Sequence, residues 1–218
     1  MFPSQILGQL LDMIDRGLLF GLEEPPDSKW QKILSVIKKS YAEFPRTQKS
    51  LSFTIVYCTR ESYGMQSTFR VFTLKEEPEL NCSGEQEIEL PENSGIISTF
   101  GSGRSFVEKW HSFWNNTPQK RTSRSVFSAF CDALYSGEDN RSGGAPQLVG
   151  LYRQGPAKSF GVIYQGQRYF LGLPVDESLD LQSIEWRNAL FERCDGLTLE
   201  RKNGAQPHHK PRGLGKAK

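Results

Sequence analysis

The order of helical and strand patterns along the chain is its strongest constraint on the fold. Two amphipathic helical patterns come first, at 4–20 and between Asp27 and Pro45. Two β-rich segments, 51–59 and 68–74, follow around a glycine-containing turn and predict a hairpin. Paired helices that alternate with grouped strands predict a layered α+β fold rather than a doubly wound parallel sheet.

The second half of the chain repeats this grouping. The acidic segment 75–95 predicts a loop with a short strand, and 95–99 predicts a further strand that leads into a small-residue turn. Two more amphipathic helices follow, with Pro118 and Thr122 marking the break between them. Three short strand patterns and a last amphipathic helix complete the expected order, at 147–153, 159–166, 168–174 and 180–194.

Composition indicates an ordinary globular protein. The chain has 218 residues, of which 37% are hydrophobic and 11% aromatic. It has no apolar run that approaches the ~20 residues of a membrane-spanning helix, and its start lacks the features of a secretory signal. Its cysteines lack the spacing of a zinc site or a redox pair, so we expect reduced thiols in the cytoplasm: Cys58, Cys82, Cys131 and Cys194.

Positive charge is concentrated at the C-terminal end. The stretch after Glu200 holds six of the 27 Lys and Arg residues and no acid, which leaves 21 basic against 25 acidic residues in the body. An acidic body argues against a broad nucleic-acid-binding face. We therefore expect a domain over 1–200 and a basic, disordered tail over 201–218. A nucleic-acid or metal role for the tail, through His208 and His209, is the alternative.

Two small-residue turns are candidates for a site. Gly101-Ser102-Gly103 falls between a predicted strand and a helix, and Asp139-x-x-Ser142-Gly143-Gly144 falls between a helix and a strand. Ordinary turn chemistry accounts for both, because glycine permits positive φ and Asp and Ser bond local backbone amides. His111 offers no Ser/His/Asp arrangement with them, and no metal or cofactor is expected.

These two turns, in this element order, resemble a proteasome-type β subunit, a member of the N-terminal-nucleophile hydrolases. The residues that carry the resemblance are "FGSGRSF" at 100–106 and "DNRSGGAPQLVGLYR" at 139–153, with Ser102 and Asp139 37 positions apart. The resemblance covers roughly residues 5–195. It implies a four-layer αββα sandwich, hydrolysis of peptide or protein amide bonds, no cofactor, and assembly of copies into rings.

The resemblance also implies roles for three residues. Asp139 would orient and charge-balance the α-amino group of an N-terminal nucleophile, Ser142 would hydrogen-bond the same network, and Ser102 would lie beside the nucleophile. All three are supporting residues. The family's nucleophile, with its own Asp and Lys, lies on strands that precede the first helix. Lys29, Lys32 and Lys38 fall on the second helix and match nothing catalytic.

The chain begins at the first helix of the family pattern, without the strands that carry the nucleophile. As written, we expect it to be inactive. Three explanations remain open at this point. The sequence is part of a competent hydrolase, or it is a degenerate subunit that assembles without catalysing, or the resemblance is accidental and the chain is a binding module of another α+β fold.

Overall fold

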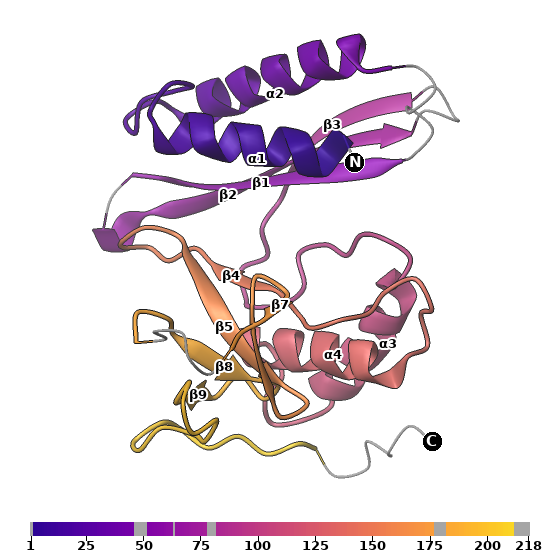
Figure 1. The fold of residues 1–218 in the computed structure, drawn as a ribbon, viewed down its shortest axis with the longest axis vertical. Coiled ribbons are helices and arrows are strands. Elements are labelled where there is room, and N and C mark those ends of the chain that lie inside the picture. Colours follow the sequence, from indigo (N-terminus) through magenta and orange to yellow (C-terminus); the bar gives the residue numbers. More distant parts are fainter. Residues whose placement is uncertain (1, 46–51, 63, 78–81, 177–181, 212–218) are drawn as a thin grey trace. The chain divides into compact units, whose positions relative to one another are not determined.

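The computed structural model describes residues 2–45, 52–62, 64–77, 82–176 and 182–211, and they form a mixed α+β structure (Figure 1). Residues up to Leu90, together with Arg153–Gly155, form an N-terminal unit, and the other described residues form a C-terminal unit. The sequence pattern had indicated one domain over 1–200. The two units have separate apolar cores, so each is described by itself.

The N-terminal unit is a helix pair on an antiparallel sheet. Its helices are α1 (Phe2–Asp15) and α2 (Pro26–Glu43), and its strands are β1 (Phe53–Glu61), β2 (Thr68–Glu77) and β3 (Cys82–Ile88), in the order β1-β2-β3. A short 3-10 turn, Gly64–Gln66, connects β1 to β2. Both helices lie on one face of this sheet (Figure 1).

Side-chain periodicity explains how this core forms. Helical spacing places the apolar residues of each helix, α1 and α2, along the side that faces the sheet. Strand alternation places Ile55, Phe72 and Leu74 on the sheet face that these helices cover. Trp30 of α2 stacks on Phe72, with ring centroids 5.6 Å apart. The core is completed by buried residues of both helices: Phe2, Ile6, Leu10, Trp30, Ile33, Leu34 and Ile37.

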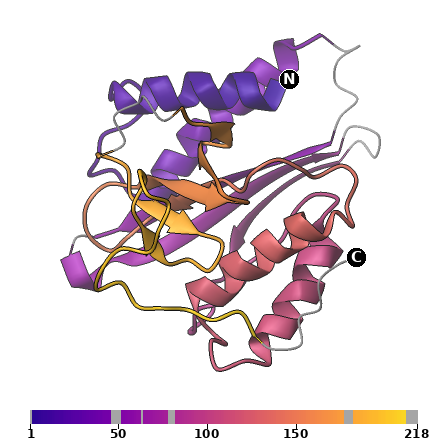
Figure 2. The same cartoon turned by 60° about the horizontal axis from the view of Figure 1, so that its bottom comes forward.

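The C-terminal unit contains a second helix pair and a mixed sheet. Helices α3 (Arg104–Asn115) and α4 (Ser123–Ser136) run side by side, as both ribbon views show (Figure 2). The strand order is β7-β6-β5-β8-β9, with β4 also paired to β5. These strands are β4 (Leu148–Gly150), β5 (Lys158–Tyr164), β6 (Gln167–Phe170), β7 (Leu173–Pro174), β8 (Trp186–Asn188) and β9 (Arg193–Cys194).

Strand β5 lies at the centre of this sheet, and its residues from Phe160 to Tyr164 are all buried. It pairs antiparallel with β4 and β6 but parallel with β8. Val162 and Tyr164 pack with Phe127 and Cys131 of α4, which joins the helix pair to the sheet. None of the helices in the described parts of the chain is long and apolar enough to cross a membrane.

The helix predicted at 180–194 is wrong for its described residues, 182–194. They form β8, a tight turn and β9 instead. The Asn188 side chain accepts hydrogen bonds from the backbone N–H groups of Leu190 and Glu192, both at 3.0 Å, and so replaces the helical pattern. Trp186 is 2% exposed and packs beside β5, a tertiary contact that outweighs the helical periodicity.

The strand predicted at 95–99 is also wrong. These residues are extended, but among the described residues their backbone makes no hydrogen bond to another backbone group. They lie between β3 and the Gly101 turn, and no strand of the described chain pairs with them. An apolar strand-like sequence has therefore kept its extended form without a partner.

The stretch after Glu200, expected to be disordered, makes defined contacts over 201–211. The backbone N–H of His208 donates to the Glu192 carboxylate at 2.7 Å, and Lys210 Nζ donates to Asp132 at 2.6 Å. Glu192 is buried, and a buried carboxylate needs hydrogen-bond donors. The tail supplies one of them, which charge counting along the sequence does not reveal. Residues 212–218 of the predicted tail lie outside the described residues.

Candidate functional site

The Gly-Ser-Gly turn forms the start of α3 and places Ser102 at the surface. Gly101 has a φ of 87°, in the left-handed region where glycine carries no steric penalty. Gly103 caps the helix at its N-terminal end. A Cβ at Gly103 would lie 3.1 Å from Asp139 Oδ2 and 3.4 Å from Ser142 Oγ. The second glycine of the turn therefore leaves room for the other candidate loop, which a side chain there would crowd.

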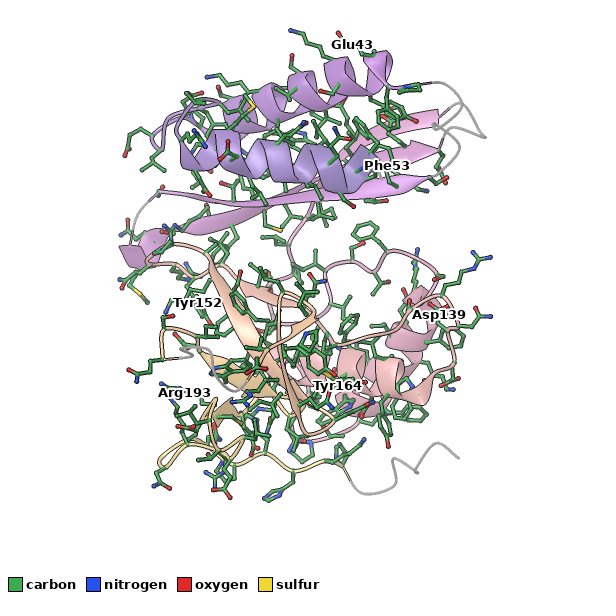
Figure 3. The ribbon with its side chains drawn as sticks, in the orientation of Figure 1. Glu43, Phe53, Asp139, Tyr152, Tyr164 and Arg193 are labelled. Atoms are coloured by element: carbon green, nitrogen blue, oxygen red, sulfur yellow. The ribbon has the colours of Figure 1, made fainter. Side chains whose placement is uncertain are left out.

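That second loop begins where α4 ends. Gly137 caps α4 in the left-handed conformation, with a φ of 65°, and Asp139 follows two residues later (Figure 3). Asp139 Oδ1 accepts the backbone N–H of Arg141 at 3.1 Å, a local turn contact. The loop is also tied to α3, because Lys109 Nζ donates to Glu138 at 2.7 Å.

The two loops converge on one carboxylate oxygen. Ser102 Oγ donates to Asp139 Oδ2 at 2.8 Å, and Ser142 Oγ donates to the same oxygen at 2.6 Å. Local turn chemistry explains the second contact but not the first, which joins residues 37 positions apart. The three residues selected from the sequence therefore form one cluster, named here the Asp139 cluster.

These donors hold Asp139 in its charged form. Hydrogen bonds from Ser142, then Ser102, then the Arg141 backbone lower the pKa of the Asp139 carboxyl below its ordinary value. A carboxylate of low pKa is a weak base, so it accepts hydrogen bonds well but removes a proton from a serine hydroxyl poorly. The cluster is suited to binding a cationic group rather than to activating either serine.

We expect the Ser142→Ala variant to raise the pKa of Asp139 more than Ser102→Ala does, because Ser142 makes the shorter hydrogen bond. Stability from these bonds is present above the unfolded-state pKa of about 3.9 and is lost as the pH falls through the lower folded-state pKa. Carboxyl ¹³C NMR titration of Asp139 in the wild type and both variants measures this. Identical titration curves would show that the hydroxyls do not bind the carboxylate in solution.

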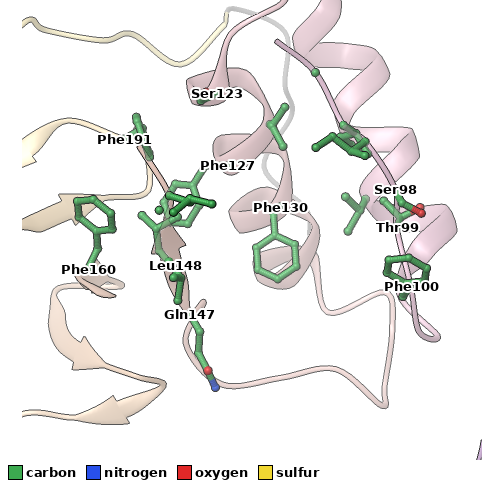
Figure 4. Close-up of a pocket in the computed structure, with 18 of the residues that line it drawn as sticks. Ser98, Thr99, Phe100, Ser123, Phe127, Phe130, Gln147, Leu148, Phe160 and Phe191 are labelled. Carbon is green, nitrogen blue, oxygen red and sulfur yellow. The ribbon is translucent and has the colours of Figure 1, made fainter. Parts of the chain in front are cut away.

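Two residues of the cluster, Asp139 and Ser142, line the smaller of two adjoining hollows in the C-terminal unit. The smaller, of about 70 Å³, is lined by Gly103, Asp139 and Ser142 and by apolar side chains of both helices. The larger is a groove of about 790 Å³ lined by 95–100, α4 and β4–β5 residues (Figure 4). Phe100, Val107 and Phe130 line both, so the groove adjoins the smaller hollow. Apart from the apolar residues that line it, no sequence pattern indicated this groove.

The other sequence candidates lie apart from the cluster in their contacts. His111 Nδ1 contacts Asn115 at 3.3 Å, and burial lowers the pKa of the His111 ring. His208 Nδ1 contacts the Leu190 carbonyl oxygen at 2.7 Å. The described residues hold no group of three or more His, Cys, Asp or Glu side chains placed to bind a metal ion.

The three lysines of α2 make contacts within the N-terminal unit. Lys29 Nζ donates to the Leu22 carbonyl, Lys32 pairs with Glu24, and Lys38 pairs with Glu85. Each of these contacts connects α2 to a neighbouring segment of its own unit.

The chain matches no protein-family model, no curated protein sequence and no solved structure.

Proposed function

We propose that the chain is a subunit of an N-terminal-nucleophile amide hydrolase of the proteasome β type, acting on peptides or proteins. The observation that carries this proposal is the convergence of Ser102 and Ser142 on a single oxygen of Asp139. The two motifs that supply these residues are far apart in sequence, and turn formation alone does not require them to meet.

The cluster's role would be to hold the amine of the nucleophile. An N-terminal Thr, Ser or Cys uses its own α-amino group as proton acceptor, so that amine must be held in place and its charge balanced. An ionised carboxylate fixed by two hydroxyls and a backbone N–H meets this need. Neither Ser102 nor Ser142 is proposed as the nucleophile, because their shared acceptor is a weak base.

The composition of the two units supports a four-layer αββα sandwich as the complete fold. Each unit contributes one helix pair and one sheet. The N-terminal sheet carries apolar residues on both faces: Ile55 and Phe72 face its helices, whereas strand alternation places Val56 and Val71, among polar residues such as Thr73, on the opposite face. The apolar residues of the second face favour cover there as well. Ring-type assembly with copies of itself is part of the same proposal.

Hydrolysis by the product of the complete native reading frame tests this function. The purified protein would be assayed with fluorogenic peptide amides, and its size measured by light scattering. We expect turnover with a burst of product, because a nucleophile forms a covalent acyl intermediate. A folded, assembled protein without turnover would contradict the hydrolase proposal and favour a non-catalytic assembly subunit. A monomer would contradict ring assembly.

A further inference from the structure

The groove of the C-terminal unit is lined by apolar side chains and is bordered by two extended segments. It is lined by consecutive residues at 95–100 and again at 147–152, with α4 residues between them (Figure 4). Strand side chains alternate between faces, so consecutive lining residues indicate that each segment borders the groove with its backbone. The groove is therefore a slot between two extended segments.

Strand β4 and the segment 95–100 both have backbone groups available for pairing. Among the described residues, β4 pairs with β5 alone, and the backbone of 95–100 makes no backbone hydrogen bond. Unpaired N–H and C=O groups along an extended edge form a template for a further strand. Backbone polar groups that become buried without partners are costly, which favours an occupant that carries its own N–H and C=O groups.

The residues that line the groove indicate which side chains a bound segment would carry. Phe127 and Phe130 of α4 line it, and Ile97, Phe100 and Val149 are 46%, 47% and 62% exposed. Among the described residues that line it, Arg104 alone is charged, and its guanidinium is paired with Glu108 at 2.8 Å. A neutral apolar slot is complementary to an uncharged apolar segment rather than to a charged one.

We propose that this groove binds an extended, uncharged polypeptide segment with apolar side chains at alternate positions. The segment adds as a strand to the free edge of β4, and its apolar side chains pack on α4. Backbone pairing supplies the direction and register of binding, and the apolar floor selects the side chains. The inference does not depend on hydrolysis, so it stands or falls separately from the proposed function.

A synthetic probe tests the proposal on the full chain. The probe is a blocked peptide with the sequence Lys-Val-Thr-Val-Thr-Val-Thr, labelled on the lysine with an uncharged BODIPY fluorophore and followed by fluorescence anisotropy. A second peptide carries N-methyl groups on alternate amides of the edge that would pair, which removes donors without removing apolar surface. We expect the N-methylated peptide to bind at least about tenfold more weakly.

Matched variants and hydrogen exchange locate the binding. Val149→Asp places a charge on an exposed groove residue and should weaken probe binding, whereas Leu11→Asp, on an exposed α1 leucine that does not line the groove, should not. Hydrogen–deuterium exchange should show new protection at 95–100 and 147–152 in the presence of the probe. Absence of probe binding, equal binding of the N-methylated peptide, or protection elsewhere would each overturn the proposal.

Discussion

The Asp139→Asn variant is expected to hydrolyse peptide amides about 100-fold or more slowly than the wild type, in a preparation of the protein that has this activity. Asparagine has the shape of aspartate but lacks its charge. Its amide nitrogen donates hydrogen bonds, so it cannot serve all three donors that Asp139 accepts, from Ser102, Ser142 and the Arg141 backbone. Steady-state kinetics with a fluorogenic peptide measures the change in kcat.

Asp195→Asn is the matched control. Asp195 lies in the same unit, and its carboxylate also accepts two backbone N–H groups, from Leu197 and Thr198, which lower the pKa of the Asp195 carboxyl. It is not part of the Asp139 cluster, so its substitution should leave kcat unchanged. Equal kcat values for Asp139→Asn and the wild type would show that Asp139 does not support the nucleophile.

The Gly161→Ala variant is expected to lower the free energy of unfolding of the C-terminal unit by about 3 kcal/mol. A methyl group at Gly161 would lie 2.5 Å from Cδ2 and 2.6 Å from Cζ3 of Trp186, whose indole is buried. Neither β5 nor β8 can move away easily, because the two strands are paired in register at this position. Thermal unfolding followed by near-UV circular dichroism should show a midpoint lower by roughly 10 °C.

Gly95→Ala serves as the comparison for that experiment. A Cβ at Gly95 has no atom within 4 Å, and its backbone is outside the left-handed region, so the added methyl meets neither a clash nor strain. Its unfolding midpoint should match that of the wild type. If Gly161→Ala unfolded at the wild-type midpoint as well, Trp186 would not fill the space above Gly161 in solution.

The sequence predicted an element correctly where the residue pattern of that segment alone indicated its secondary structure. The four helices α1 to α4 follow from apolar spacing and capping residues, because Thr122 begins α4 and Gly137 ends it. The hairpin of β1 and β2 follows from β-branched and aromatic runs on either side of a turn. The three residues of the Asp139 cluster were also selected from the sequence, through the two small-residue turn motifs, and the structure brings them together.

The predictions failed for segments whose structure depends on residues far away in the sequence. Residues 182–194 have helical spacing but do not form a helix, because Trp186 packs between Gly161 of β5 and Gly196. The strand-like sequence at 95–99 has no pairing partner among the described residues. The basic stretch after Glu200 is held by Glu192 and Asp132, two carboxylates that charge counting treats as ordinary surface.

The sequence by itself determined the helix pairs, the hairpin and the residue types of the candidate site, because these depend on neighbours within one or two turns of chain. Only the tertiary structure decided that Ser102 reaches Asp139 across 37 positions and that Gly103 lies close against the Asp139 and Ser142 side chains. It also decided that two extended segments border an apolar groove. The physical reason is the same in each case: the free energy of these features comes from contacts between segments, which no local pattern records.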